Sequence, residues 1–187
     1  MQLPFDFRFI WSGAKVTFPF VARGISAEAT SSYMLPRLIG ASRATSILLT
    51  GATLPATSHL FSGLYHETLP TREEVYPAAL AFAKKLAVTT SPASVAWTKA
   101  LIQHPGDSAE ENHLLDSPAI RILGKGKDAQ EGVQAFFEKR NPKFDNSLKI
   151  LDGHVPWVRS SFLLAPSSVL TLYQWRSPDT KHRKSKL

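Results

Sequence analysis

The chain has 187 residues, of which 43% are hydrophobic and 20% charged, and its formal net charge is +7. These values are typical of a globular protein with a sizeable core. The absence of cysteine excludes disulfides, thiolate zinc sites and cysteine nucleophiles. Because the six histidines stand singly, no metal site is predicted.

The positive charge is concentrated near the C-terminus. Residues 174–187 contain five basic residues and one acidic residue, so this segment carries +4 of the net +7. Aromatic residues are not interleaved with these bases as a nucleotide-stacking surface requires. We therefore expect a solvated basic tail and no binding to nucleic acid.

Alternating polar and apolar residues open the chain. They predict strands over residues 6–11 and 15–18, which a turn at Ser12-Gly13 separates. From Ser26, itself a candidate N-cap, the period becomes that of short helices. The expected elements are helices over 26–35, 42–49 and 55–61, which stop at Pro36, Gly51 and Gly63, and a brief strand over 64–68.

Longer helices are expected from Thr71 onward. Thr71 and Glu74 form a capping box, and the apolar residues over 75–86 keep helical spacing. Ser91 and Ser108 are the predicted caps of the next two helices. The expected ranges are 92–102, a helix opening over 108–111 with a candidate interruption at Ser117-Pro118, and a last helix over 128–139.

A few strands followed by many short helices is an unusual order for an α/β protein, in which strands and helices normally alternate throughout. The order indicates the helical end of a fold whose sheet lies upstream. We predict that residues 1–145 form this part of a domain. Residues 146–187 are predicted to be an irregular extension with a basic tail.

Four groups of residues, in their order and spacing, resemble the crotonase superfamily of enoyl-CoA hydratases and isomerases. They are Leu35-Pro36-Arg37-Leu38-Ile39-Gly40 with Leu48-Leu49-Thr50-Gly51, then Phe61-Ser62-Gly63-Leu64-Tyr65, the proline-led run Pro92 to Lys99, and Asp128 to Phe144. The resemblance implies an α/β, crotonase-like fold, of which this fragment holds mostly the C-terminal helical region of the ββα spiral. It covers only the second half of a complete member. The half with both backbone donors of the oxyanion hole is not matched.

Within the superfamily, residues 19–33 are most similar to peroxisomal Δ3,Δ2-enoyl-CoA isomerases. Those enzymes have a Pro-Phe pair, a glycine and a glutamate at the spacing of Pro19-Phe20, Gly24 and Glu28. The resemblance implies that Glu28 is the catalytic base. The hydratases instead place a catalytic glutamate where this chain has Phe20. The chain differs from the family at the next position: the family usually has glycine after this glutamate, and this chain has Ala29.

Moving a double bond from C3 to C2 of an acyl-CoA requires a proton to leave the carbon alpha to the thioester and a proton to return at C4. One carboxylate can do both if an apolar pocket raises its pKa, and two backbone N–H groups must stabilise the dienolate oxygen. Hydration needs a positioned water and typically a second carboxylate. Glu28 is the candidate base; the alternative is an acid in the first turn of the helix expected from Ser26.

Phe136 and Lys139 fall where the family contacts CoA, and a lysine ammonium suits phosphate. The alternative is a core phenylalanine with a solvated lysine one turn on. The resemblance also implies that CoA arrives as part of the acyl-CoA substrate, with no other cofactor and no metal. Intact members assemble as homo-oligomers, trimers or hexamers.

The last three residues, Ser185-Lys186-Leu187, match the C-terminal signal that the peroxisomal import receptor reads. The most apolar stretch, residues 162–175, is too short and too interrupted to span a membrane. We therefore predict a peroxisomal enoyl-CoA isomerase, serving fatty-acid oxidation or acyl-chain modification for a secondary metabolite. The alternative is a truncated, inactive family member, either an accessory subunit or a degenerate gene product.

Overall fold

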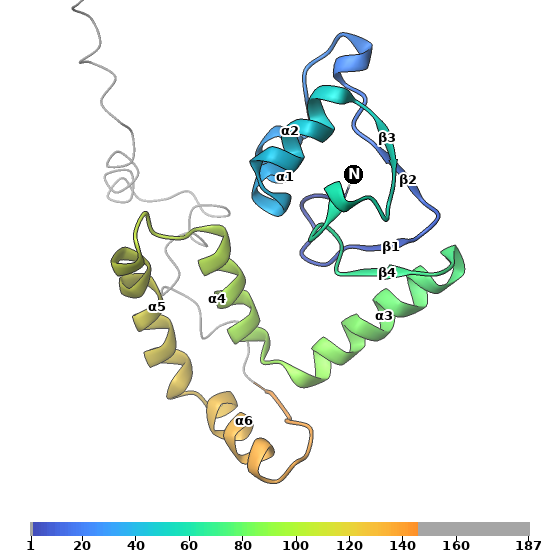
Figure 1. The fold of residues 1–187 in the computed structure, drawn as a ribbon. Helices are drawn as coiled ribbons and strands as arrows, with labels where there is room; N and C mark the ends of the chain where they lie inside the picture. The colour runs from blue at the N-terminus through green and yellow to red at the C-terminus, as the bar shows by residue number, and fades with distance from the viewer. Residues whose placement is uncertain (1, 146–187) are drawn as a thin grey trace, which may run out of the picture. The chain divides into compact units, whose positions relative to one another are not determined.

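The computed structural model describes residues 2–145. The expected extension over 146–187, including the C-terminal Ser-Lys-Leu, lies outside the described residues. The chain divides into two compact units, the first reaching Leu86 and the second beginning at Ala87 (Figure 1). Each unit has its own architecture and is described by itself.

The first unit contains two small sheets of two strands each. β1 (Phe9–Trp11) runs parallel to β4 (Glu67–Leu69), and β2 (Lys15–Thr17) runs antiparallel to β3 (Thr53–Pro55). The two strands expected at the start of the chain are thus present in shortened form, and the strand expected over 64–68 forms slightly later, as β4.

The segment around Pro55 differs from expectation. The predicted helix over 55–61 is wrong: Thr53–Pro55 form β3, and only the last three residues form a short 3-10 helix, η2 (His59–Phe61). The reason is a tertiary contact, because β3 pairs with β2, almost forty residues earlier. Local periodicity cannot show such a partner.

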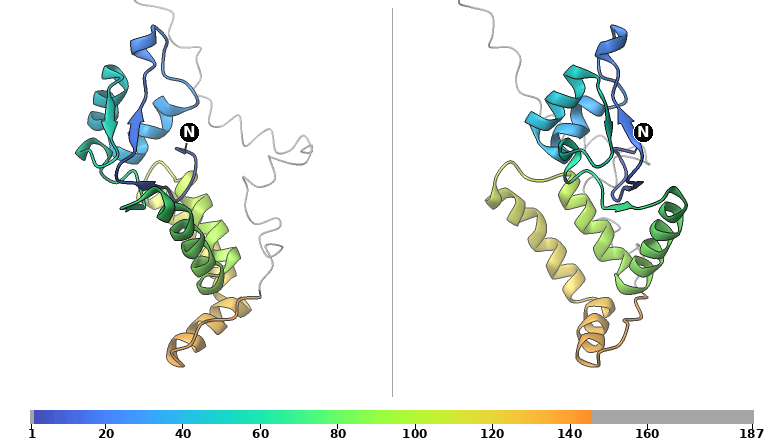
Figure 2. Two further views of the ribbon diagram at one scale, coloured as in Figure 1. Left: turned by 90° about the vertical axis from the view of Figure 1, so that its right-hand side faces the viewer. Right: turned by 45° about the vertical axis from the view of Figure 1, so that its right-hand side comes forward.

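Two helices cover the β2–β3 pair and supply part of the core (Figures 1 and 2). They are α1 (Ser31–Ile39) and α2 (Ala41–Thr50), and Gly51 ends α2 in the left-handed conformation, as expected. The side chains that are almost completely buried are those of Leu35, Ile39 and Ile47. The other buried members of the cluster are Leu3, Phe18, Phe20, Ala44, Phe61 and Leu64.

The expected start and end of α1 are both wrong. The helix begins at Ser31 rather than Ser26, because Ala29 and Thr30 adopt left-handed backbone angles that a helix cannot contain. It also continues through Pro36 to Ile39. Proline removes one helical hydrogen bond, and the complete burial of Leu35 and the near-complete burial of Ile39 offset this loss.

As far as residue 145, the second unit consists of helices and their connections. After α3 (Arg72–Thr89), whose last residues enter this unit, come α4 (Pro92–Gln103), α5 (Ala109–Gly124) and α6 (Lys127–Phe137). Helices α4 and α5 lie side by side over a small core of Ala93, Trp97 and Ala119 (Figure 2). Pro118 does not interrupt α5.

Two of the predicted N-caps, Ser91 and Ser108, are confirmed by their hydrogen bonds, whereas Ser26 caps no helix. The Ser91 hydroxyl accepts from the Ser94 N–H at 3.4 Å, and the Ser108 hydroxyl accepts from the Glu111 N–H at 3.1 Å. For α3, the Glu74 carboxylate accepts from the Thr71 N–H at 3.0 Å, the backward bond of a capping box. These helices therefore begin where local side-chain chemistry places them.

Candidate functional site

Glu28 lies in the loop between the short helix η1 (Val21–Arg23) and α1, with its side chain exposed. Its backbone is tightly held: the Glu28 carbonyl accepts from the Ser31 N–H at 3.0 Å and from the Ser31 hydroxyl at 2.7 Å. Ser31 is completely buried. The carboxylate therefore projects from a fixed turn, and its alternative role as a first-turn helix acid is wrong, because α1 begins three residues later.

The turn after Glu28 is strained. Ala29 has a φ of 48° and Thr30 a φ of 59°, and each non-glycine residue in this region costs about 1–2 kcal/mol. Within residues 2–145, the only other non-glycine residue with positive φ is Lys139. Strain of this kind persists where surrounding structure over-determines it, and it is enriched at functional sites.

Phe20 is the residue at which the sequence resemblance implies a glutamate in the hydratases. Its side chain is buried in the core of the first unit, and its carbonyl accepts from the N–H groups of Arg23 and Ile25 at 3.0 and 3.1 Å. Phe20 therefore anchors the loop that leads to Glu28. It provides packing at this position, with no group that could activate water.

Lys139 ends α6 in a Schellman motif. With a φ of 53°, it directs its N–H to the Phe136 carbonyl at 3.3 Å, and the next N–H, that of Arg140, reaches the Ala135 carbonyl at 3.1 Å. The Lys139 side chain is exposed. Glycine is the usual residue at this place, so the lysine is held there against a conformational cost.

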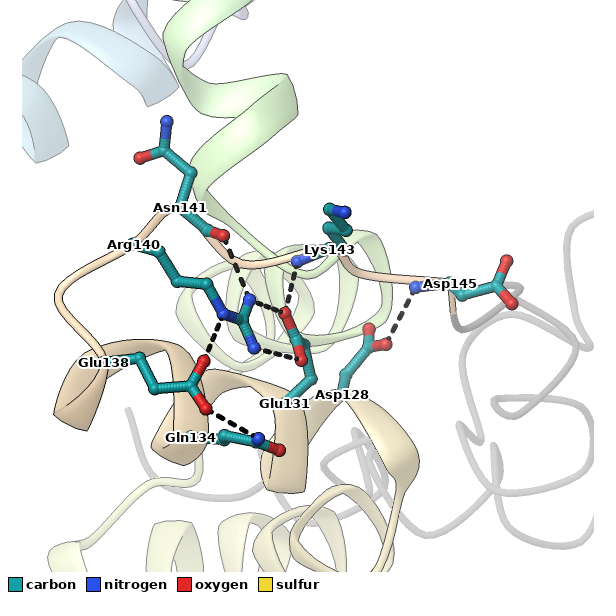
Figure 3. Close-up of polar contacts among 8 residues, drawn as sticks. All are labelled: Asp128, Glu131, Gln134, Glu138, Arg140, Asn141, Lys143 and Asp145. Carbon is teal, nitrogen blue, oxygen red and sulfur yellow. Dashed lines mark hydrogen bonds and ion pairs between the residues drawn. The ribbon is translucent and has the colours of Figure 1, made fainter.

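An ion-pair cluster holds the segment after Lys139 against α6 (Figure 3). The Arg140 guanidinium donates to both oxygens of Glu131, at 2.5 and 3.0 Å, and to Glu138 at 2.5 Å. Glu131 also accepts from the Lys143 N–H at 2.7 Å. The hydrogen bond from Arg140, and then that from Lys143, lowers the pKa of Glu131 to about 2. We call Glu131, Glu138, Arg140 and the Lys143 backbone the clasp.

Phe136 is exposed, so its alternative role as a core residue is wrong. Its side chain is 79% exposed and that of Phe137 is 76% exposed, and the two rings contact edge to face. Together with Val133 and Phe144 they line a mostly apolar groove of about 570 Å³. Phe136 and Lys139 thus lie together at the end of α6, whereas Glu28 belongs to the other unit.

One polar cluster was not expected from the sequence. On α5, the His113 ring contacts the Asp116 carboxylate at 3.3 Å and the Ser117 hydroxyl at 3.4 Å. The order of groups is that of a hydrolase triad, and its sequence signal is the i, i+3, i+4 spacing. His113 and Asp116 are 77% and 45% exposed, however, so water has free access. The cluster is best explained as helix-surface pairing.

The described residues show neither a metal site nor a membrane span. In residues 2–145, no three His, Asp or Glu side chains are grouped to hold a metal ion. No helix in the same range combines the length and the apolar character needed to cross a membrane.

Comparison with known proteins identifies the family. The enoyl-CoA hydratase/isomerase family model matches residues 1–147. The chain belongs to the enoyl-CoA hydratase/isomerase family. It is similar to two enoyl-CoA hydratases of Alternaria alternata, with 42% and 43% identity over 82% of this chain, and to a mevalonyl-coenzyme A hydratase of Beauveria bassiana, with 31% identity over 79%.

Solved structures confirm the crotonase-like α/β fold. A probable enoyl-CoA hydratase/isomerase from Mycobacterium abscessus superposes with a TM-score of 0.72 at 33% identity, covering 78% of this chain and 57% of that one. The chain spans about half the length of the curated relatives it matches, 52% for both Alternaria proteins. The family assignment from sequence is thus confirmed.

The strain at Ala29 leads to the first prediction. Ala29→Gly removes a cost of about 1–2 kcal/mol for the left-handed residue but adds about 0.5–1 kcal/mol of unfolded-chain entropy. We therefore expect the free energy of unfolding to rise by up to about 1.5 kcal/mol in urea denaturation. The control Ala83→Gly, within α3, should lower it by about 1 kcal/mol. Equal losses in the two variants would contradict the strain.

The clasp leads to a prediction about pH. Because the pKa of Glu131 is lowered in the folded state to about 2, its contribution to stability is fully present above its ordinary pKa of 4.5 and is lost as pH falls toward 2. Glu131→Gln should therefore show a smaller loss of stability than the parent chain between pH 4.5 and 2. Urea unfolding followed by circular dichroism measures this. Glu110→Gln, an exposed acid on α5, is the control and should keep the parent slope.

Proposed function

We propose that the chain supplies the base of an enoyl-CoA isomerase site, with Glu28 moving a proton between C2 and C4 of a 3-enoyl-CoA. The observation that carries this proposal is the strained turn: Glu28 is fixed through its own carbonyl to the buried Ser31, and Ala29 and Thr30 accept left-handed angles to keep it there. Because Ser31 is buried in the core, the turn cannot relax by moving this residue. Backbone strain held in this way is enriched at functional sites.

The arrangement suits proton shuttling and not water activation. Glu28 is a carboxylate on a rigid backbone, so its position relative to a bound acyl chain can be reproducible, as general-base catalysis requires. Phe20 fills the position of a second carboxylate with a buried ring. A dienolate would form as Glu28 removes the C2 proton, and the same carboxylic acid would return that proton at C4.

The end of α6 is the proposed contact for the CoA portion of a substrate. Phe136 offers an exposed aromatic face beside the apolar groove, on which an adenine ring can stack, and Lys139 provides a mobile positive charge three residues later. The clasp fixes the backbone from which both project. CoA would enter with the substrate, and no further cofactor is proposed.

Two other functions are kept as alternatives. The Alternaria relatives carry the name enoyl-CoA hydratase, which favours hydration of a 2-enoyl-CoA as the second candidate. The third is a catalytically inactive accessory subunit. The first two candidates differ in product, and the third gives none.

The test is an assay with a 3-enoyl-CoA that follows conjugation to the 2-enoyl product. It is run on the chain alone and on the chain co-expressed with the half of an Alternaria relative that it does not match. We expect turnover in the co-expressed sample. Glu28→Gln should lower kcat by roughly 10²–10⁴-fold, the usual contribution of a general base, whereas Glu73→Gln, an exposed acid on α3, should leave it unchanged.

Three outcomes would contradict the isomerase proposal. Turnover that persists in Glu28→Gln would exclude Glu28 as the base. A 3-hydroxyacyl-CoA product from a 2-enoyl-CoA, without isomerisation, would favour the hydratase. A folded sample that turns over neither substrate would favour the accessory subunit.

We also propose that the protein is imported into peroxisomes. The C-terminal Ser185-Lys186-Leu187 supports this proposal. A fluorescent protein joined to the N-terminus should show punctate signal that coincides with a peroxisomal marker in fungal cells. Removing the last three residues should disperse it, since the receptor reads them at a free C-terminus. Punctate signal after their removal would contradict the proposal. The pathway served, fatty-acid oxidation or acyl-chain modification for a secondary metabolite, is part of the same proposal.

A further inference from the structure

The segment that follows α6 folds back along the helix (Figure 3). At one end of this segment, the Arg140 guanidinium donates to both oxygens of Glu131. At the other end, the Asp145 N–H donates to the Asp128 carboxylate at 3.0 Å. Both acids belong to the first two turns of α6. We call residues 140–145 the strap, and its backbone is fixed to α6 at both ends.

The strap brings an aromatic ring to the groove on α6. Phe144 is half-buried and lines the same groove as Val133 and Phe136. Its ring lies over Gly132 of α6, where a Cβ atom would already be in contact with it, at 3.6 Å. The groove therefore has one wall from α6 and a second wall from the strap.

The strap also carries a positive charge that its own contacts do not use. The Arg140 guanidinium is bound by the carboxylates of Glu131 and Glu138, so it has no charge left for a ligand. Lys143 is different, because only its backbone N–H takes part in the clasp, and its side chain is exposed. Within residues 2–145, neither its ammonium nor that of Lys139 forms an ion pair. Two available cations thus stand beside residues of an aromatic groove.

The nucleotide portion of CoA has the complementary chemistry. It joins an adenine ring to a ribose that carries a 3′-phosphate and leads into a diphosphate. An aromatic surface and more than one cation suit such a ligand. Because the 3′-phosphate is on the same ribose as the adenine, a cation adjacent in the chain to a ring of the groove is well placed to meet it.

We propose that the strap is the second wall of the nucleotide site, in which Phe144 contacts the adenine and Lys143 binds the 3′-phosphate. Glu131 is a positioning residue, which acts on both side chains by holding the strap in the clasp. The inference rests on the CoA contact proposed for Phe136 and Lys139, and it does not depend on the chemistry of Glu28.

The test measures binding by isothermal titration calorimetry, with CoA and with 3′-dephospho-CoA as the two ligands. The full chain is compared with its Lys143→Met and Phe144→Leu variants. Lys84→Met and Tyr76→Leu are the matched controls, since they make the same changes of charge and aromatic area at exposed positions on α3. Circular dichroism checks that each variant is folded.

We expect the parent chain to bind CoA more tightly than 3′-dephospho-CoA. Lys143→Met should weaken binding of CoA by about fivefold, as the loss of one exposed ion pair implies, and should change binding of 3′-dephospho-CoA by less than about twofold. Phe144→Leu should weaken binding of both ligands by about fivefold, since both contain the adenine. The two controls should leave both affinities unchanged.

The positioning role of Glu131 is tested by a double-mutant cycle. Glu131→Gln should weaken binding of both ligands, because it removes the ionic contact that holds the strap. In this background the further change Lys143→Met should weaken CoA binding by less than about twofold, since the lysine is no longer held at the site. Full additivity of the two changes would exclude the positioning role.

Three results would overturn the proposal. They are a folded parent chain that does not distinguish CoA from 3′-dephospho-CoA or binds neither, a Lys143→Met variant that loses both ligands equally or neither, and a Lys84→Met control that matches it. These readouts are independent of turnover. A chain that shows the expected selectivity for the 3′-phosphate but no isomerase activity would retain the nucleotide site while removing the proposed function.

Discussion

A single buried guanidinium organises the first unit. Arg8 is only 8% exposed and donates to the carbonyls of Leu3, Phe5 and Leu64, while its own carbonyl accepts from the His66 N–H. A buried charge is tolerated only where its donors are matched, and burial lowers the pKa of Arg8 from its ordinary value. These contacts join the residue before β1 to the segment before β4, and so support the register in which the two strands pair.

Backbone strain marks both places to which the family resemblance assigns function. At Glu28 the strain falls on Ala29 and Thr30, and the buried Ser31 sustains it. At the end of α6 it falls on Lys139, and the clasp sustains it through Arg140 and Glu131. In each case a polar side chain projects from a turn whose backbone angles favour glycine, and neighbouring contacts keep the turn in that conformation. Positive φ angles at non-glycine residues occur at both places, one in each unit. This favours a requirement on the position of the two side chains over an accident of local packing.

Sequence reasoning succeeded where structure is decided locally. Ser91 and Ser108 cap their helices and Gly51 ends α2, because a hydroxyl or a missing side chain acts on the neighbouring turn. It failed where distant residues decide. The strand at Thr53–Pro55 exists because of β2, and α1 passes Pro36 because Leu35 and Ile39 are buried. The exposure of Phe136 could not be read from helical spacing, since a periodic apolar residue faces a core only if a core is there.

The exposure of Glu28 bears directly on the proposed chemistry. A carboxylate acts as a base toward a carbon acid most effectively when an apolar, water-excluding pocket raises its pKa toward neutrality. The side chain of Glu28, however, is exposed in the structure of residues 2–145. The first unit holds the backbone of Glu28 firmly but supplies little enclosure around the carboxylate. The proposed chemistry therefore requires an enclosure of the carboxylate that the first unit does not itself provide, so the fixed backbone of Glu28 meets only one of the two requirements on a catalytic base.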